Sequence, residues 1–381
     1  MAFIIALAAW AATFLGLMGG FYALYAAYAV SRFFTSSSSR RRTSSPTISI
    51  LKPLKNAEPG LRQALESFCR QDYDGPVQIV CGVLDRNDPA IEVVQTLQAE
   101  RPELDLVLVI DDTAGGANLK ISNLIHIARA ARHDVLVVSD CDISVPSDYL
   151  SRVVAALEQP GIGVATSLYV GQGRRGLWSQ LSAMGINYQF LPNVAVGYSL
   201  GLAEPCMGST IALTTQTLAR IGGFESLRDH LADDFQLGRA VCALGEHIAL
   251  PPMVVGHGCD EKDAGELISH ELRWNRTIRL IDGAGYFGSI ITHAFPLALI
   301  GAALGGFSEV SLALVVAILI SRLILKLRID AVTGAKAGSL WLVPVRDVLS
   351  FAIFLASLTG STVTWRGIRY RVGSDGILSP L

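Results

Sequence analysis

The chain has 381 residues, of which 51% are hydrophobic and 17% charged, and its 31 basic and 33 acidic side chains give a formal net charge of −2. An average soluble domain carries about 25% charged residues, so this composition argues against an ordinary cytosolic protein and against a disordered one. The lack of a basic excess also excludes a nucleic-acid-binding protein that relies on its overall charge.

The N-terminal segment is predicted to be a membrane anchor. Residues 2–30 carry no charge, and about 20 apolar residues are enough to cross a bilayer. The segment lacks a basic start and is too long for the hydrophobic region of a cleaved signal peptide. Arg32 and the basic residues 40–42 follow it, so the positive-inside rule places the next part of the chain in the cytoplasm. A nucleic-acid-binding patch at 40–42 is the less favoured alternative.

The middle of the chain, residues 46–285, is predicted to be an α/β domain. Short β-rich runs alternate with helical stretches there, which is typical of a mostly parallel sheet with helices on both faces. Such sheets bind ligands at the carboxyl ends of their strands. The six cysteines form no CxxC pair, which favours reduced thiols over a disulfide framework or a zinc site. The expected strands are residues 47–51, 77–83, 106–110 and 135–138, and the expected helices are 60–70, 90–99 and 121–131.

The C-terminal part is predicted to return to the membrane. The apolar block of residues 290–325 fits two helices joined by a tight turn near Ser308. A shorter stretch, residues 348–364, has charged residues at both ends, which favours a re-entrant or interfacial helix. The expected organisation is an anchor (1–31), a linker (32–45), an α/β domain (46–285), transmembrane or interfacial helices (286–365) and a basic tail (366–381).

Two acidic groups follow predicted strands. Asp85 and Asp88 come after the second strand, where a carboxylate can accept hydrogen bonds from a nucleotide base or ribose; a β-turn is an equal alternative. Asp140 and Asp142 come directly after the fourth strand. Two carboxylates at this spacing predict a site for Mg²⁺ or Mn²⁺ that would also hold a substrate diphosphate. Their alternative role is in a turn or a helix cap.

Two further motifs carry candidate catalytic groups. Asp233 and Asp234 lie between apolar residues, where unpaired carboxylates are costly, so they are candidates for a general base or for the start of a helix. His270, Arg273 and Trp274 share one face of a predicted helix. The planar guanidinium can hold a diphosphate and the indole can form a wall for a sugar or an acceptor. A basic helix on the membrane surface is the alternative.

The stretch 174–202 is mostly apolar and begins with two arginines. It is a candidate for a lid that docks on the bilayer and admits a lipid, and a core helix followed by a strand is the equal alternative.

The order of these motifs resembles the membrane-bound glycosyltransferases of families 2 and 21, and above all the ceramide glucosyltransferase family with its bacterial hopanoid-biosynthesis branch. The resemblance covers about residues 47–299 and the N-terminal anchor, and it implies a GT-A fold with transmembrane helices at both ends. The stretches that carry it are residues 51–54, 88–91, 118–124, 132–140, 208–210, 230–234, 270–274 and 285–286.

The resemblance implies an inverting, non-processive transfer of a sugar from a UDP-sugar to a lipid hydroxyl at the bacterial inner membrane, with the catalytic domain in the cytoplasm. N-acetylglucosamine and bacteriohopanetetrol are the favoured pair, and UDP-glucose with ceramide is the alternative. By this resemblance, Asp85 and Asp88 lie at the uridine, and Asn118, Lys120 and Asn123 lie near the nucleotide. Asp140 and Asp142 hold the metal, and Asp234 is the base with Asp233 beside it. His270, Arg273 and Trp274 lie at the diphosphate and the acceptor. His270 stands where many members of the family have Gln or Arg, although a neutral histidine can still donate one hydrogen bond.

Three rival classes fit the sequence less well. A processive polysaccharide synthase needs more membrane helices than this chain offers. A non-catalytic sensor of nucleotide-sugars is expected to lack at least one of the acidic or arginine motif residues. A nicotinamide-dependent oxidoreductase is expected to have GxGxxG after the first strand, where residues 51–54 contain no glycine.

Overall fold

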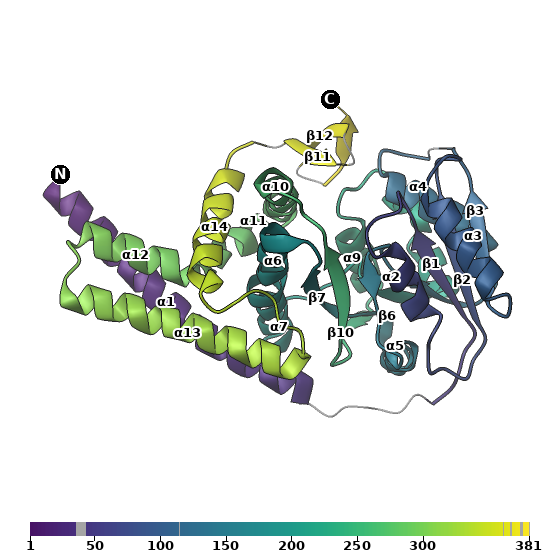
Figure 1. The fold of residues 1–381 in the computed structure, drawn as a ribbon, viewed down its shortest axis with the longest axis horizontal. Coiled ribbons are helices and arrows are strands. Elements are labelled where there is room, and N and C mark those ends of the chain that lie inside the picture. The colour runs from purple at the N-terminus through teal and green to yellow at the C-terminus, as the bar shows by residue number, and fades with distance from the viewer. Residues whose placement is uncertain (36–42, 114, 361, 366–367, 374–375, 381) are drawn as a thin grey trace.

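The computed structural model describes residues 1–35, 43–113, 115–360, 362–365, 368–373 and 376–380. A bundle of long helices lies at one end of the molecule and a mixed sheet with its helices lies at the other (Figure 1). The basic residues 40–42 of the predicted linker fall outside the described residues.

The main sheet has the strand order β3-β2-β1-β4-β8-β6-β9. Its first four strands are parallel, β8 is antiparallel to both of its neighbours, and β9 is parallel to β6. The predicted mostly parallel sheet is therefore confirmed. The strands are β1 (Ile48–Pro53), β2 (Val77–Val83), β3 (Asp105–Ile110), β4 (Val135–Val138), β6 (Ile162–Thr166), β8 (Ile211–Thr214) and β9 (His247–Ala249).

Two buried apolar layers cover the faces of this sheet, because side chains alternate along each strand. Ile48 and Ile50 of β1 pack with one layer and Leu51 with the other. The first layer is covered by α2 (Leu61–Phe68), α3 (Ala90–Glu100) and α5 (Tyr149–Leu157). The second is covered by α4 (Leu119–Ala130), α8 (Thr215–Arg220), the 3₁₀ helix η2 (Phe224–Leu227) and α9 (Asp233–Ala243).

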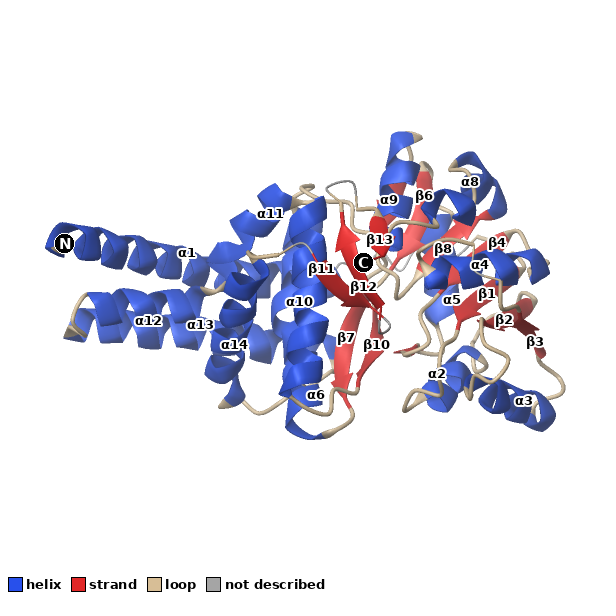
Figure 2. Ribbon diagram, turned by 90° about the horizontal axis from the view of Figure 1, so that it is seen from above, coloured by secondary structure: helices blue, strands red, loops and turns tan. Residues whose placement is uncertain are grey.

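A smaller sheet and a long helix connect the two ends of the molecule. The small sheet contains β5 (Ile143–Ser144), β10 (Val254–Cys259) and β7 (Leu168–Gly173), in that order. Helix α10 (Ala264–Ile281) lies between this sheet and α14 (Leu342–Ser357), as Figure 2 shows. Through β5, which follows Asp142 in the chain, the small sheet begins beside the loop that leaves β4.

The stretch 174–202 forms a helical run and no strand. It consists of α6 (Gly176–Gly185), the π-helical turn η1 (Ile186–Phe190) and α7 (Leu191–Ser199). Leu181, Met184 and Leu191 are buried in the core, and the Tyr188 hydroxyl donates to Asp330 of the C-terminal helix α13 (Glu309–Thr333; 2.6 Å). This packing agrees with the core-helix interpretation of the stretch and not with a free lid.

Three helices form the membrane-side bundle. Among the described residues, α1 (Ala2–Thr35) and α13 (Glu309–Thr333) are long and apolar enough to span a membrane. The helices of 283–292 and α12 (Ala294–Leu304), which are bent by 65° from one another, pass the same test when they are taken together as one broken span. Gly19 permits α1 to approach the backbone of residues 283–292 closely, because a Cβ at Gly19 would lie 2.2 Å from the Ile291 carbonyl oxygen. The bent segment contains α11 (Gly283–Gly288) and the 3₁₀ helix η3 (Ser289–Thr292).

The C-terminal stretch differs from the expected helix. Helix α14 ends at Ser357, and a small antiparallel sheet follows within the regions expected to be a helix and a tail. Its strands are β11 (Thr362–Trp365), β12 (Ile368–Val372) and β13 (Leu378–Pro380). The Leu378 amide donates to the Asp229 carbonyl oxygen (2.8 Å), so a contact about 150 residues away along the chain holds this segment, and local hydropathy cannot predict such a contact.

Candidate active site

The centre of the candidate site is Lys120, which joins two acidic motifs. Its Nζ lies 2.9 Å from Asp140 Oδ1 and 3.1 Å from Asp233 Oδ2. Burial lowers the pKa of Lys120, but the neighbouring carboxylates of Asp140, Asp233 and Asp234 raise it further, so the net shift is upward. The structure therefore brings together the loop after β4 and the first turns of α4 and α9.

Asn118 holds the start of α4 against the start of α9. Its Oδ1 accepts hydrogen bonds from the amides of Lys120 (2.9 Å) and Ile121 (3.1 Å), as a helix N-cap does. Its Nδ2 donates to the His230 carbonyl oxygen (2.7 Å) and to Asp233 Oδ1 (3.3 Å). Asn118, which was predicted to lie near the nucleotide, thus fixes Lys120 and Asp233 relative to each other.

Asp234 has the properties of a base that is held in place. Its Oδ2 accepts from the Gly208 amide (3.0 Å) and its Oδ1 from the Phe235 amide (2.8 Å). Burial and the charge of Asp233 raise the pKa of Asp234 to about 6, although Lys120 and the two amides act in the opposite direction. A carboxylate whose pKa is raised in this way is a better proton acceptor than a solvated aspartate.

Gly208 faces all of these groups. A Cβ at this position would lie 2.9 Å from Asp140 Oδ2, 3.0 Å from Lys120 Nζ and 3.5 Å from Asp234 Oδ2. The space above the glycine is thus bordered by two carboxylates and one ammonium group. A side chain there would fill the place where a ligand can reach all three.

Asp142 contacts a histidine that the sequence analysis did not identify. His257 of β10 places its Nε2 3.2 Å from Asp142 Oδ2, because β10 pairs with β5 immediately after this aspartate. Burial lowers the pKa of His257, but Asp142 and Cys259 raise it more, so the net pKa is about 10. The sequence contains no local signal for this contact, since His257 is remote from the acidic motifs along the chain.

The two aspartates leave oxygens for a divalent cation. Asp142 Oδ1 is buried without a hydrogen-bond partner, and Asp140 Oδ2 faces the space above Gly208. Among the described residues, no group of three or more His, Cys, Asp or Glu side chains converges on a metal position. Two carboxylate oxygens fit Mg²⁺ or Mn²⁺ that completes its coordination with water and substrate phosphates.

Helix α10 presents the predicted face of His270, Arg273 and Trp274. The His270 and Trp274 rings lie 4.2 Å apart between centroids, and Arg273 Cζ is 6.0 Å from the Trp274 ring. The Trp274 ring is in turn 6.2 Å from that of His257, so this face lies next to the Asp142 side of the site. His270 Nδ1 is 3.0 Å from Glu261 Oε1, a second contact that the sequence analysis missed.

The other predicted nucleotide residues make backbone contacts. Asp88 accepts from the amides of Asn56 (2.9 Å) and Ala90 (2.8 Å), and Asp85 accepts from the Asn87 amide (2.8 Å), as expected for turns. These contacts place the carboxylates at the end of β2. Their role toward a nucleotide stays a prediction.

Asn123 and Lys52 hold the ends of the strands. Asn123 is buried and donates to the carbonyl oxygens of Gly82 (2.8 Å) and Leu54 (3.3 Å), which joins β1 to β2. Lys52 is fully buried, donates to the Asp140 carbonyl oxygen, and lies 4.1 Å from the centre of the Phe68 ring. Burial lowers the pKa of Lys52 to about 8. The lysine thus supports the backbone of the aspartate loop, a role that was not predicted.

Comparison with known sequences identifies the family. Residues 10–378 match the profile of glycosyl transferase family 21. The chain belongs to this family. It is 25% identical over 201 residues to ceramide glucosyltransferase 1 of Caenorhabditis elegans, a match that covers 52% of this chain and 43% of that protein. It is also 26% identical over 137 residues to an N-acetylglucosaminyltransferase of Bradyrhizobium diazoefficiens, covering 35% and 27% of the two chains.

Comparison with solved structures confirms the GT-A glycosyltransferase fold of this family 21 protein. The mannosyltransferase PcManGT of Pyrobaculum calidifontis, solved in complex with GDP-mannose and Mn²⁺, aligns with a TM-score of 0.54 and 19% identity over 94% of this chain and 98% of its own. This likeness concerns the fold. The chain spans about half the length, or less, of the curated relatives that it matches.

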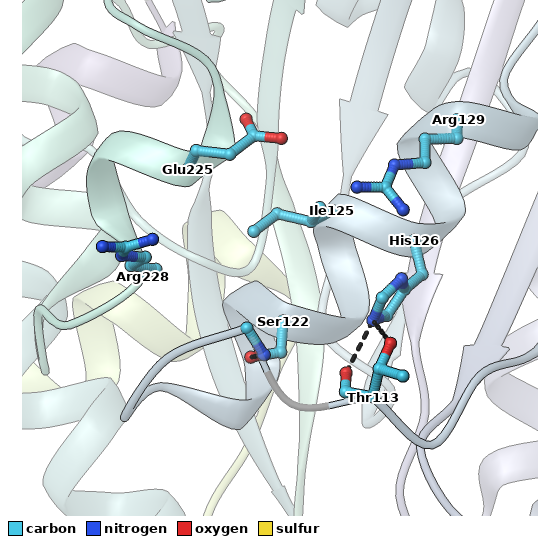
Figure 3. Close-up of a pocket in the computed structure, with 8 residues that line it drawn as sticks. Thr113, Ser122, Ile125, His126, Arg129, Glu225 and Arg228 are labelled. Carbon is cyan, nitrogen blue, oxygen red and sulfur yellow. Dashed lines mark hydrogen bonds between the residues drawn. The ribbon is translucent and has the colours of Figure 1, made fainter.

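A separate cavity of about 270 Å³ lies on another face of α4 in this glycosyltransferase (Figure 3). His126 borders it, and its ring Nε2 lies 2.8 Å from the Thr113 carbonyl oxygen. None of the predicted site residues lines this cavity. Its lining consists of Thr113, Gly115, Ser122, Ile125, His126, Arg129, Glu225 and Arg228.

Proposed function

We propose that this family 21 glycosyltransferase transfers one sugar from a UDP-sugar to the hydroxyl of a membrane lipid, with inversion at the anomeric carbon. The observation that carries the proposal is the convergence of Asp140, Asp234 and Lys120 around Gly208. A single displacement requires a base beside the diphosphate site, and this convergence supports that assignment of roles.

Asp234 is the proposed general base. Its carboxylate takes the proton of the acceptor hydroxyl while that oxygen attacks the anomeric carbon. The bond from this carbon to the diphosphate breaks, and its electron pair stays on the β-phosphate oxygen of UDP. Attack opposite the leaving group turns an α-linked donor into a β-glycoside.

The second requirement of the reaction is that the negative charge of the leaving diphosphate is neutralised. Asp140 and Asp142 would hold a divalent cation, Mg²⁺ or Mn²⁺, which neutralises that charge when bound. Arg273 and His270 of α10 are proposed to donate hydrogen bonds to the same phosphates, and Trp274 to form a wall of the sugar or acceptor site. The likeness to a mannosyltransferase solved with GDP-mannose and Mn²⁺ supports a nucleotide-sugar and a metal.

Asp85, Asp88, Asn118, Lys120 and Asn123 are proposed to surround the nucleotide. They lie at the carboxyl ends of β1 and β2 and at the start of α4, the edge where such sheets bind ligands. In this proposal Asn123 acts indirectly, because its amide is engaged with the strand ends, whereas Asp85 and Lys120 reach the nucleotide.

The lipid acceptor is proposed from the membrane helices and the relatives. Helices α1 and α13 are apolar enough to span a bilayer, which supports an acceptor that resides in the membrane. N-acetylglucosamine and a polyhydroxylated hopanoid, bacteriohopanetetrol, form our first choice, which the bacterial N-acetylglucosaminyltransferase relative supports. UDP-glucose and ceramide form the second, which the ceramide glucosyltransferase relatives support. The proposed location is the bacterial inner membrane, with the α/β domain in the cytoplasm.

The test is an activity screen of the purified full chain in detergent or nanodiscs. The protein is incubated with separate UDP-sugars, with Mg²⁺ or Mn²⁺, and with bacteriohopanetetrol, ceramide or total membrane lipid, and new glycolipids are identified by mass spectrometry. We expect one glycosylated product with a single added sugar. No product and no UDP release with any donor would refute the proposal and would favour a non-catalytic nucleotide-sugar-binding protein.

A further inference from the structure

Glu261 is a buried carboxylate that the proposed mechanism does not use. Its side chain is 7% exposed and lies between β10 and the start of α10. One oxygen, Oε1, accepts from Ser182 Oγ (2.8 Å) and lies 3.0 Å from His270 Nδ1. The other oxygen, Oε2, is buried and has no hydrogen-bond partner.

The charge of this carboxylate has one available counterpart. Among the described residues, His270 is the one basic side chain at ion-pair distance from Glu261. A buried carboxylate is costly unless it is hydrogen-bonded, so Glu261 holds the His270 ring with its Nδ1 toward Oε1. Since the carboxylate oxygen can only accept, the Nδ1 of His270 carries a hydrogen, and the ring has Nε2 left for another partner.

The position of His270 indicates what that other partner is. The ring stays 27% exposed, so a ligand can reach it, and it packs against Trp274. Trp274 approaches His257, and His257 contacts Asp142. The rings of His270, Trp274 and His257 thus form a row of contacts between Glu261 and Asp142, one of the two aspartates that are proposed to hold the metal and the diphosphate.

We infer that Glu261 is a positioning residue, which holds Nδ1–H of His270 so that Nε2 faces the departing diphosphate of the nucleotide. A ring between two groups that only accept donates from both of its nitrogens, so His270 takes up a proton when the diphosphate binds and Nε2–H donates to it. The inference rests on the proposed function. The β-phosphate oxygen gains negative charge as its bond to the sugar breaks, so a fixed cationic donor stabilises the products and the transition state more than the bound donor sugar. No proton has to leave His270 in this step.

The first experiment separates positioning from simple structural support. Glu261→Gln keeps the shape of the side chain and removes its charge, and we expect it to lower kcat about tenfold while the KM for the UDP-sugar changes less than about twofold. The affinity for UDP, measured by calorimetry in the same detergent, is expected to fall about tenfold. Glu266→Gln is the matched control, because it makes the same substitution at an exposed residue in the first turn of α10, and it should leave all three quantities unchanged.

The second experiment places Glu261→Gln in a His270→Gln background. His270→Gln itself lowers kcat, but its amide can donate without the help of a carboxylate. Glu261→Gln should therefore have less than about a twofold further effect there. An equal loss in both backgrounds would identify Glu261 as a structural residue and overturn the inference.

A pair of variants at His270 covers the case in which Glu261→Gln does not fold. His270→Phe keeps a ring against Trp274 but has no donor, whereas His270→Gln keeps a donor. We expect UDP affinity to fall at least about fivefold further in His270→Phe, and equal affinities would overturn the donor role. A wild-type protein without turnover or UDP release refutes the proposed function, whereas an active wild type with an equally active Glu261→Gln refutes this inference alone.

Discussion

Two regions of this protein bury charged side chains, and they do so in opposite ways. In the candidate site, four carboxylates face one lysine and one histidine; the six residues are Asp140, Asp142, Asp233, Asp234, Lys120 and His257. At the junction of α13, α14 and α10, each acid has its own base. Arg322 donates to Asp347 through Nε (2.8 Å) and Nη2 (2.9 Å), and Arg346 lies 2.8 Å from Glu271.

The difference between the two regions reflects different roles: the ion pairs hold helices together, and the acidic candidate site is suited to receive a ligand. The ion pairs compensate one another's charge, and they connect a membrane helix through α14 to the helix that carries His270 and Trp274, although Nε and Nη1 of Arg346 are buried without a hydrogen-bond partner. Four carboxylates beside one lysine and one histidine keep an excess of negative charge, and a buried oxygen of Asp142 has no hydrogen-bond partner. Such an excess is expected where a cation and the groups bound to it are to be received.

The largest expected effect concerns the base. Asp234→Asn should lower kcat about 10³-fold, because the amide cannot accept the acceptor proton, while the affinity for the UDP-sugar stays within a few fold. Turnover measured by UDP release and binding measured by calorimetry check the two parts. Asp148→Asn, the same substitution at a partly exposed aspartate just before α5, is the control. Near-native turnover of Asp234→Asn would show that another group is the base.

The next effect concerns the matched pairs. Asp347→Asn leaves the Arg322 guanidinium buried without its carboxylate and should reduce the free energy of unfolding by about 3–5 kcal/mol. A neutral double variant, Arg322→Met with Asp347→Leu, should recover most of that loss. Thermal unfolding of the purified protein in detergent measures both. If Asp347→Asn unfolds at the wild-type temperature, this pair has no architectural role.

A smaller effect is expected at the metal. Asp142→Asn removes one proposed ligand charge and should raise the Mn²⁺ concentration for half-maximal activity about tenfold. Direct Mn²⁺ binding, followed by electron paramagnetic resonance in the presence of UDP, should weaken in parallel. An unchanged Mn²⁺ affinity in that second measurement would remove Asp142 from the metal site.

The smallest effect is a shift in pH dependence. With a pKa of about 6 for Asp234, kcat/KM should fall about tenfold for each pH unit below 6, because protonation inactivates the base. Lys120→Gln removes a positive charge that stabilises the carboxylate, so the pKa of Asp234 should rise by roughly half to one unit. The acid limb of the pH profile, the range in which kcat/KM falls as the pH is lowered, should move to higher pH by the same amount. A limb that stays in place or moves to lower pH would contradict the electrostatic coupling between Lys120 and Asp234.

Much of the fold could be predicted from the sequence, because the relevant signals are local. The predicted strands 77–83 and 135–138 agree with β2 and β4 residue for residue, since both are short β-branched runs between polar turns. The shared face of His270, Arg273 and Trp274 followed from helical periodicity alone. The stretch 348–364 was harder, because β11 is stabilised by partners in the α/β domain and in β12.

The candidate site shows where local reasoning ends. The sequence by itself determined the residue types: acids after strands, an acid pair at a helix start, and an arginine and a tryptophan on one helix face. The tertiary structure decided which of them meet, because the strand order places α4 and α9 beside the loop after β4, and the pairing of β10 with β5 brings His257 to Asp142. The tertiary structure also decided the surroundings of the buried carboxylates. Burial raises the pKa of Asp234 and makes the contact between Glu261 and His270 necessary, and burial depends on packing between segments distant in the chain.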